Sequence, residues 1–219
     1  MSATTGAPDM KDYYAARAAE YDAIYRKPER QADLRAIEAW LPPIFAGARV
    51  LEVACGTGYW TQFIAPVASA LRAIDAAPET MRIAAARVDA SRVRFEVGDA
   101  YALRPSDPAC DAAFAGFWFS HVPKARRLEF LAGLQAVLVP GSTVVLLDNR
   151  YVEGSSTTVS AADPAGDTWQ VRTLADGSVH RVLKNFPGEA ELRSLVEGIG
   201  TDVVHTSWPH YWALRYRTR

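Results

Sequence analysis

Short apolar runs alternate with amphipathic stretches through the middle of this chain. Runs rich in β-branched and small apolar residues predict a first strand that begins at residue 49. They predict four further strands over 70–75, 93–97, 111–116 and 143–148. The stretches after these runs predict one helix that ends near residue 65 and two further helices over 78–88 and 123–138. Strands that alternate with helices in this way indicate a parallel sheet covered on both faces.

The flanks of this alternating region carry a different pattern. Helical periodicity runs from Met10 to about Tyr25 and again over 29–40, where Pro42 ends the second helix. Residues 149–168 are small and polar, which predicts a long surface loop. Further elements are expected as a helix over about 188–198 and as strands over 201–207 and 211–217.

A hairpin is predicted over 169–186, where an Asp-Gly dipeptide separates two strand-like runs. Pairing Leu174 with Val179 places Arg172 opposite Arg181, and like charges in that position destabilise a sheet. Water, a nearby acid or an anionic ligand must compensate. Two interpretations stay open: exposed arginines screened by salt, or a cationic lid for an anionic substrate, because guanidinium groups bind carboxylates and phosphonates bidentately.

Composition limits the class of protein. The 219 residues, 49% of them hydrophobic, can form one sizeable domain, and a net charge of −1 without a long basic run argues against nucleic-acid binding. The two cysteines, Cys55 and Cys110, are expected to be free thiols in a reducing compartment. No apolar stretch approaches roughly 18 residues and no basic-plus-apolar leader begins the chain, so we expect a soluble, cytoplasmic protein that binds neither a membrane nor a metal.

The strongest chemical signal is the glycine turn at 55–58, directly after the first predicted strand. Glycine lets the backbone approach a ligand that a Cβ would obstruct. Seventeen residues after this turn the next strand ends in Asp75, an acid placed to bind the two hydroxyls of a ribose. Because ligands bind beyond the carboxyl ends of parallel strands, one edge of the sheet is expected to hold Glu52, Asp75, Asp99 and the 117–121 loop.

Two cofactor classes compete for the glycine turn. A dinucleotide fingerprint has a third glycine where this chain has Thr61, and its diphosphate faces a helix N-terminus. Glu52 at the strand end would repel a diphosphate but suits a cofactor that carries positive charge. The sequence therefore favours a cationic nucleoside, with a nicotinamide-dependent oxidoreductase as an alternative.

From residue 50 to 148 these motifs resemble, in order and spacing, the class I S-adenosylmethionine-dependent methyltransferases. Residues 50–61 resemble their first motif, with Ala54 in place of its first glycine; 93–100 resemble the third motif, 110–116 the fourth strand, and 138–148 the Pro-Gly turn and fifth strand. The resemblance implies an α/β fold with a doubly wound, mostly parallel, seven-stranded Rossmann-like sheet. It also implies a single domain over 1–219, with a helical lid at 10–45, a cofactor-binding core at 46–148, a β-hairpin cap at 149–186, and a C-terminal helix and antiparallel strand pair at 187–219.

The resemblance also implies the cofactor, S-adenosyl-L-methionine, and its contacts. Asp75 would meet the ribose and Asp99 the adenine amino group. In similar methyltransferases an N-terminal Tyr-Asp helix covers this site, which would bring Arg17 near the methionine carboxylate; simple aromatic packing of that helix is the alternative. The expected cofactor-binding residues are Tyr14, Arg17, Tyr21, Glu52, Ala54, Gly56, Thr57, Gly58, Trp60, Asp75, Ala76, Asp99, Ala100 and Phe117.

The acceptor side has a narrower resemblance. Residues 172–184, together with 58–61 and the Trp118 to Pro123 loop, are similar to the dehydrophos-type phosphonate O-methyltransferases, with His180 as a departure. This resemblance implies O-methylation of a small acidic metabolite, a phosphonate or a carboxylate, by in-line methyl transfer. The expected substrate-binding residues are Tyr25, Trp118, His121, Arg172, Arg181 and Lys184.

Other functions stay open at this point. A neutral or phenolic acceptor, methylated on nitrogen or oxygen, would need a base, and His121 is the candidate because free imidazole titrates near pH 6.5. A non-catalytic cofactor-binding protein is a further alternative, whereas methylation of a protein or nucleic acid is disfavoured by the missing basic stripe. The chain could be a monomer or a homodimer, since three aromatic residues that we expect to be exposed suit either the edge of the core or a dimer seam: Trp208, Tyr211 and Trp212.

Overall fold

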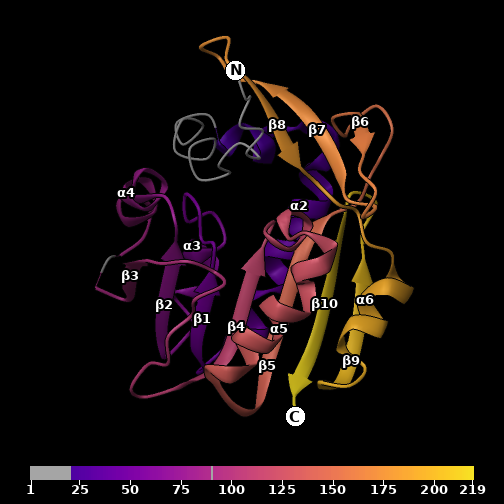
Figure 1. The fold of residues 1–219 in the computed structure, drawn as a ribbon. Helices are drawn as coiled ribbons and strands as arrows, with labels where there is room; N and C mark the ends of the chain where they lie inside the picture. Colours follow the sequence, from indigo (N-terminus) through magenta and orange to yellow (C-terminus); the bar gives the residue numbers. More distant parts are fainter. Residues whose placement is uncertain (1–20, 90) are drawn as a thin grey trace, which may run out of the picture.

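The computed structural model describes residues 21–89 and 91–219, without the side chain of Tyr21, and these residues form two sheets (Figure 1). The strands of the larger sheet are β1 (Arg49–Val53), β2 (Ala70–Asp75), β3 (Val93–Val97), β4 (Cys110–Gly116), β5 (Leu138–Asn149), β9 (Gly200–Ser207) and β10 (Tyr211–Thr218). Their order across the sheet is β3-β2-β1-β4-β5-β10-β9. Strands β1 to β5 are parallel and β10 runs antiparallel to both neighbours, so the predicted mostly parallel seven-stranded fold is confirmed.

Helices cover both faces of this sheet. The α-helices are α2 (Gln31–Trp40), α3 (Thr61–Ile64), α4 (Pro78–Arg87), α5 (Arg127–Ala136) and α6 (Glu189–Val196), and the 3-10 helices are η1 (Tyr21–Arg26), η2 (Pro28–Arg30), η3 (Pro42–Phe45), η4 (Phe119–His121) and η5 (Lys124–Arg126). Neighbouring strand residues point to opposite faces. Val50 accordingly packs in the cluster that holds Ile37 of α2, and Leu51 in the cluster that holds Phe130 of α5. Figure 1 shows α5 and α6 in front of the sheet and α2 behind it.

Most predicted elements lie where their patterns place them. Strands β2 and β3 coincide with the predicted runs. The 149–168 segment is not purely a loop, because β6 (Val159–Ala162) pairs with β7 (Thr168–Thr173), and β7 pairs with β8 (Val179–Leu183) to complete a second, three-stranded sheet. The helix predicted from Met10 falls outside the described residues up to residue 20, and its last part is the 3-10 helix η1.

The hairpin register predicted for the cap is wrong by one residue. Val179 pairs with Thr173 rather than Leu174, so Arg172 lies opposite His180 and not opposite Arg181. The cause is the turn: the Leu174 N–H donates to the Ser178 carbonyl at 2.9 Å and closes a three-residue loop in which Gly177 has φ +84°. A one-residue slip moves a side chain to the other face of a sheet, so the two arginines lie on opposite faces.

The aromatic residues near the C-terminus belong to the core. Tyr211 and Trp212 are 1% and 2% exposed, so expecting them on the surface was wrong, and Trp208 packs edge-on against Trp40 at a centroid distance of 5.4 Å. Both cysteines are free, as predicted, and both are buried. Within residues 21–89 and 91–219, no helix is long and apolar enough to cross a membrane.

Candidate active site

The glycine turn after β1 has a backbone that only small residues tolerate. Gly58 has φ +75°, and a Cβ there would lie 2.9 Å from the Ala84 Cβ and 3.0 Å from its Cα. Ala54 has φ +56°, a left-handed conformation that is strained for any residue with a Cβ. This explains why the resembling motif has glycine at that position. The turn therefore stores strain at the strand edge where a ligand is expected.

Glu52 is the buried acid of this edge. Its side chain is 1% exposed, and its Oε2 has no hydrogen-bond partner among the described residues. Burial raises its pKa to about 8; the Thr61 hydroxyl opposes this effect and the Asp75 charge adds to it. A buried carboxyl with an unused oxygen fits a ligand that brings positive charge, because such a ligand stabilises the ionised form.

Two further acids follow neighbouring strands. Asp75 Oδ2 accepts the Gly56 N–H at 2.8 Å and its Oδ1 accepts the Ala77 N–H at 2.9 Å, while burial raises its pKa. Asp75 thus fixes the glycine turn as well as ending β2. Asp99 follows β3, is exposed, and accepts the Tyr101 N–H at 2.9 Å. The ribose and adenine contacts of these acids, including those of the adjoining Ala76 and Ala100, stay predictions.

Helix η1 is held across the glycine turn by Asp22, the acid of the Tyr-Asp pair in the predicted N-terminal helix, which was not predicted as a site residue. Asp22 accepts the Thr57 hydroxyl at 2.6 Å and forms an ion pair with Arg87 at the end of α4. Three of the residues predicted to form the lid cannot be placed: Tyr14 and Arg17 lie outside the described residues, as does the side chain of Tyr21. The described part of the predicted lid therefore contacts the expected cofactor edge through Asp22.

The aromatic residues of the expected site form a packed wall. Tyr25 is buried and stacks on Tyr59 with ring centroids 3.4 Å apart, and Phe117 lies 5.6 Å away on a nearly parallel ring. Trp60 meets Phe117 edge-on at 5.8 Å. Phe117 follows β4 with φ +59°, a second strained residue at the carboxyl edge of the sheet.

Beside this wall lies a cavity of about 410 Å³ between η1, the end of β5 and the cap. Phe117 and His121 form part of its lining. Four basic side chains also line it, and no carboxylate does among the residues described: Lys27, Arg30, Arg172 and Lys184. We call this cavity the basic pocket.

His121 enters the basic pocket as a neutral ring. Burial, followed by the charges of Lys184 and Arg172, lowers its pKa well below 6.5. Its Nδ1 lies 2.6 Å from the Leu183 carbonyl oxygen, which can only accept, so Nδ1 carries the proton. The lone pair of the ring is therefore on Nε2.

The charge of Lys184 is already compensated. Its ammonium lies 2.9 Å from Asp148 Oδ1 and donates to the Ser120 hydroxyl at 2.5 Å, and both charged side chains are buried. Burial is the largest single effect and opposes ionisation of Asp148, but the charge of Lys184, together with His121 and the N–H groups of Ser120 and Asn149, outweighs it and lowers the pKa of Asp148. This pair ties β8 of the cap to β5 of the main sheet.

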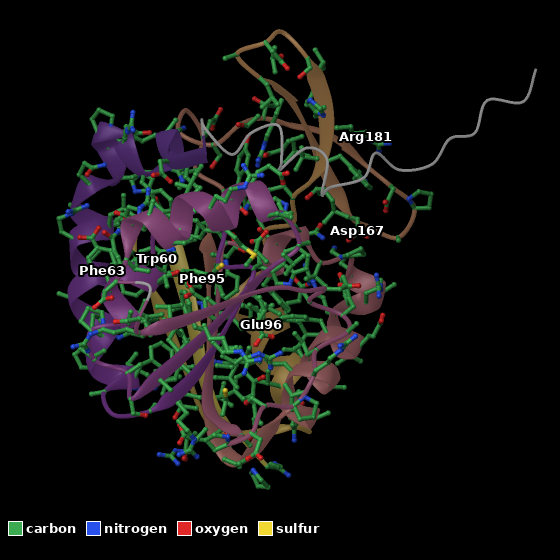
Figure 2. The ribbon with its side chains drawn as sticks, turned by 90° about the vertical axis from the view of Figure 1, so that its left-hand side faces the viewer. Trp60, Phe63, Phe95, Glu96, Asp167 and Arg181 are labelled. Atoms are coloured by element: carbon green, nitrogen blue, oxygen red, sulfur yellow. The ribbon has the colours of Figure 1, made fainter. Side chains whose placement is uncertain are left out.

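The structure brings only some of the predicted substrate residues together. Arg181 lies on the other face of the hairpin, over the Trp169 ring at 4.3 Å, and Figure 2 shows it on the cap above the sheet. Trp118 packs edge-on against Tyr101 at 6.1 Å, away from the lining. Tyr25 lies in the aromatic wall instead. The predicted residues that line the basic pocket are His121, Arg172 and Lys184.

Lys27 and Arg30 were not predicted as site residues. They belong to a short charged stretch before α2 that carries no motif. Only their charge, and their place next to a predicted lid, could have indicated them.

Comparison with known proteins agrees with this geometry. Residues 50–141 match the methyltransferase domain family. Together with the fold and the glycine turn, this match makes the chain similar to the class I S-adenosylmethionine-dependent methyltransferases, and S-adenosylmethionine is its cofactor. The unpaired Glu52 oxygen and the close packing at Gly58 fit that cofactor.

DhpI is one of the proteins that the chain is similar to. The DhpI chain in a complex with SAH is 29% identical in sequence to this chain, and the match covers 94% of each chain with a TM-score of 0.78. The DhpI chain in a complex with SAM and HEP is 28% identical in sequence to this chain. That match covers 99% of this chain and 100% of the DhpI chain, with a TM-score of 0.79. The trans-aconitate 2-methyltransferase of Variovorax paradoxus is 27% identical over 161 residues, which are 69% of this chain and 61% of that protein, so the chain spans less than two thirds of that relative.

Proposed function

We propose that this protein transfers the methyl group of S-adenosylmethionine to an acidic oxygen, carboxylate or phosphonate, of a small molecule. The basic pocket is the observation that carries the proposal, because four cationic side chains and no described carboxylate surround a cavity sized for a small acceptor. The name of one relative agrees, because trans-aconitate, a carboxylate, is the substrate named for the Variovorax enzyme.

Methyl transfer to an acidic oxygen requires the protein mainly to orient the acceptor and the cofactor. The cofactor supplies a methyl group already activated by positive sulfur. An anionic oxygen is a competent nucleophile at neutral pH, so no side chain has to remove a proton. Holding two reactants in line can contribute about 7–11 kcal/mol.

Arg172 is the residue best placed to orient the acceptor. Its guanidinium donates to the Gln170 Oε1 from Nε at 3.2 Å and from Nη2 at 2.7 Å, and these two hydrogen bonds fix its plane. A planar guanidinium so held binds a carboxylate or phosphonate in one orientation.

Turnover with a panel of acids tests the proposal. Carboxylates, phosphonates and their uncharged amides are incubated with S-adenosylmethionine, and formation of S-adenosylhomocysteine is measured. Arg172→Met should lower kcat/KM for the acids by about tenfold or more, whereas Arg181→Met, on the other face of the hairpin, should leave it unchanged. Methylation of the amides at the rate of the acids, or equal effects of the two substitutions, would exclude the proposal.

Methylation of a neutral acceptor is the second candidate, because the His121 ring carries its lone pair on Nε2. If a phenol is the acceptor, kcat should require unprotonated His121 and should fall in His121→Ala at every pH. The acidic acceptor predicts instead that His121→Ala changes KM more than kcat.

A further inference from the structure

Two basic side chains of the basic pocket have no role in the proposed function, in which Arg172 orients the acceptor. Lys27 and Arg30 line it from the segment that joins η1 to α2. Arg30 is 5% exposed, and neither side chain forms an ion pair with a residue in the described part of the chain. Buried charges in proteins are normally paired, so this arrangement needs a physical reason.

Neutral oxygens hold both cations in place. Arg30 donates from Nε to the Ser155 hydroxyl at 2.9 Å and from Nη1 to Asn149 Oδ1 at 2.8 Å. Lys27 donates to the Ser155 carbonyl oxygen, and an ammonium group has three donors. These contacts orient the two groups toward the pocket without neutralising them.

The two charges also act on each other. Burial lowers the pKa of Lys27, and the charge of Arg30 lowers it further. The charge of Glu29 opposes this effect and raises the pKa of Lys27, but Glu29 is exposed, does not line the pocket, and accepts the Ser155 hydroxyl at 2.7 Å. A bound anion would relieve this repulsion, since it favours the charged form of both groups.

Lys27 and Arg30 add two positive charges to the pocket in which Arg172 is proposed to bind the acceptor, and neutral oxygens hold both of them. A single negative charge cannot balance these two cations. We propose that Lys27 and Arg30, held by Ser155 and Asn149, bind a second negative charge of the acceptor, so that the preferred substrate is a small dianion that loses one charge on methylation. This inference rests on the proposed function and assigns its substrate class.

Binding without turnover tests the inference. The full chain is saturated with S-adenosylhomocysteine and titrated by calorimetry at about pH 9 with glutarate, ethylphosphonate and butyrate. Glutarate carries two charges on two groups, ethylphosphonate carries two on one group, and butyrate carries one. The variant is Lys27→Met, which keeps the length of the side chain, and the matched control is Lys124→Met in η5, which does not line the pocket.

We expect Lys27→Met to weaken binding of at least one dianion by about tenfold or more, the range of a lost charge-assisted hydrogen bond, while butyrate changes by less than about twofold. An effect on glutarate alone assigns the charges to two groups, and an effect on ethylphosphonate assigns them to one. Lys124→Met should behave as the wild type. Unchanged affinity of both dianions, or equal weakening of butyrate, overturns the inference and leaves the proposed function intact.

Folding and the proposed function are checked separately. Affinity for S-adenosylhomocysteine and the unfolding midpoint show whether Lys27→Met is folded, and Arg30→Gln provides a second variant that removes the neighbouring charge. If no acid of any charge binds the wild-type protein, the proposed function fails and the dianion site fails with it.

Discussion

Glu52 makes the stability of the cofactor-free protein depend on pH in a way that a single substitution can isolate. Burial raises the pKa of its carboxyl from 4.5 to about 8. Between these values the folded state holds a proton that the unfolded state has lost, so stability is highest below pH 4.5 and falls as the pH rises toward 8. At 1.36 kcal/mol per pKa unit, the loss attributable to Glu52 is about 5 kcal/mol.

Glu52→Gln removes the titration and keeps the shape of the side chain. We expect its free energy of unfolding, relative to the wild type, to rise steadily from pH 5 to pH 8 and to gain several kcal/mol in total. Urea unfolding of both proteins at each pH measures the difference, and titrating groups that do not interact with Glu52 cancel in it. Parallel curves, with a difference constant to within about 1 kcal/mol, would refute the reasoning that Glu52 is a buried carboxyl without a compensating charge.

Three further predictions concern the glycine turn, the lid and the cap. Gly58→Val should abolish binding of S-adenosylhomocysteine in calorimetry, because its Cβ would meet Ala84 at 2.9 Å and φ is +75°; unchanged affinity would contradict the site. Asp22→Asn should weaken that binding by about threefold to tenfold through loss of the ion pair with Arg87, and exchanging the two charges in Asp22→Arg/Arg87→Asp should restore part of it. Lys184→Met should lower the free energy of unfolding by about 3–5 kcal/mol, because it leaves the buried carboxylate of Asp148 unpaired. Adding Asp148→Asn should recover much of this loss. Equal stability of Lys184→Met and the wild type would show that the pair is not desolvated.

The central sheet was predictable because its signals are local. Apolar runs buried on both faces are typical of parallel strands, and β2 and β3 follow them to the residue. The acids that end strands, Glu52 and Asp75, could be placed at one edge from chain order alone, since the carboxyl ends of parallel strands share that edge.

The cap was harder to predict for a specific physical reason. An Asp-Gly dipeptide is compatible with loops of different length, and Gly177 in the left-handed conformation selects a three-residue loop where four residues were expected. That single residue moves Arg181 away from the face of Arg172. Strand β6 has four residues, all at least partly exposed, so no apolar pattern marks it.

The basic pocket depends on contacts between distant segments. Arg30 meets Ser155 across 125 positions of the chain, and Lys184 meets Asp148 across 36. Local patterns carry no information about such contacts. The sequence therefore could not indicate that Lys27 and Arg30 line the same pocket as Arg172 and Lys184.

A crystal structure of the complex with S-adenosylhomocysteine and glutarate would test the central claim most directly. The account predicts the nucleoside over the glycine turn beside Glu52 and Asp75, with the sulfur facing the basic pocket and the diacid between it and Arg172. A nucleoside whose sulfur points away from that pocket, or a diacid bound elsewhere on the molecule, would contradict it.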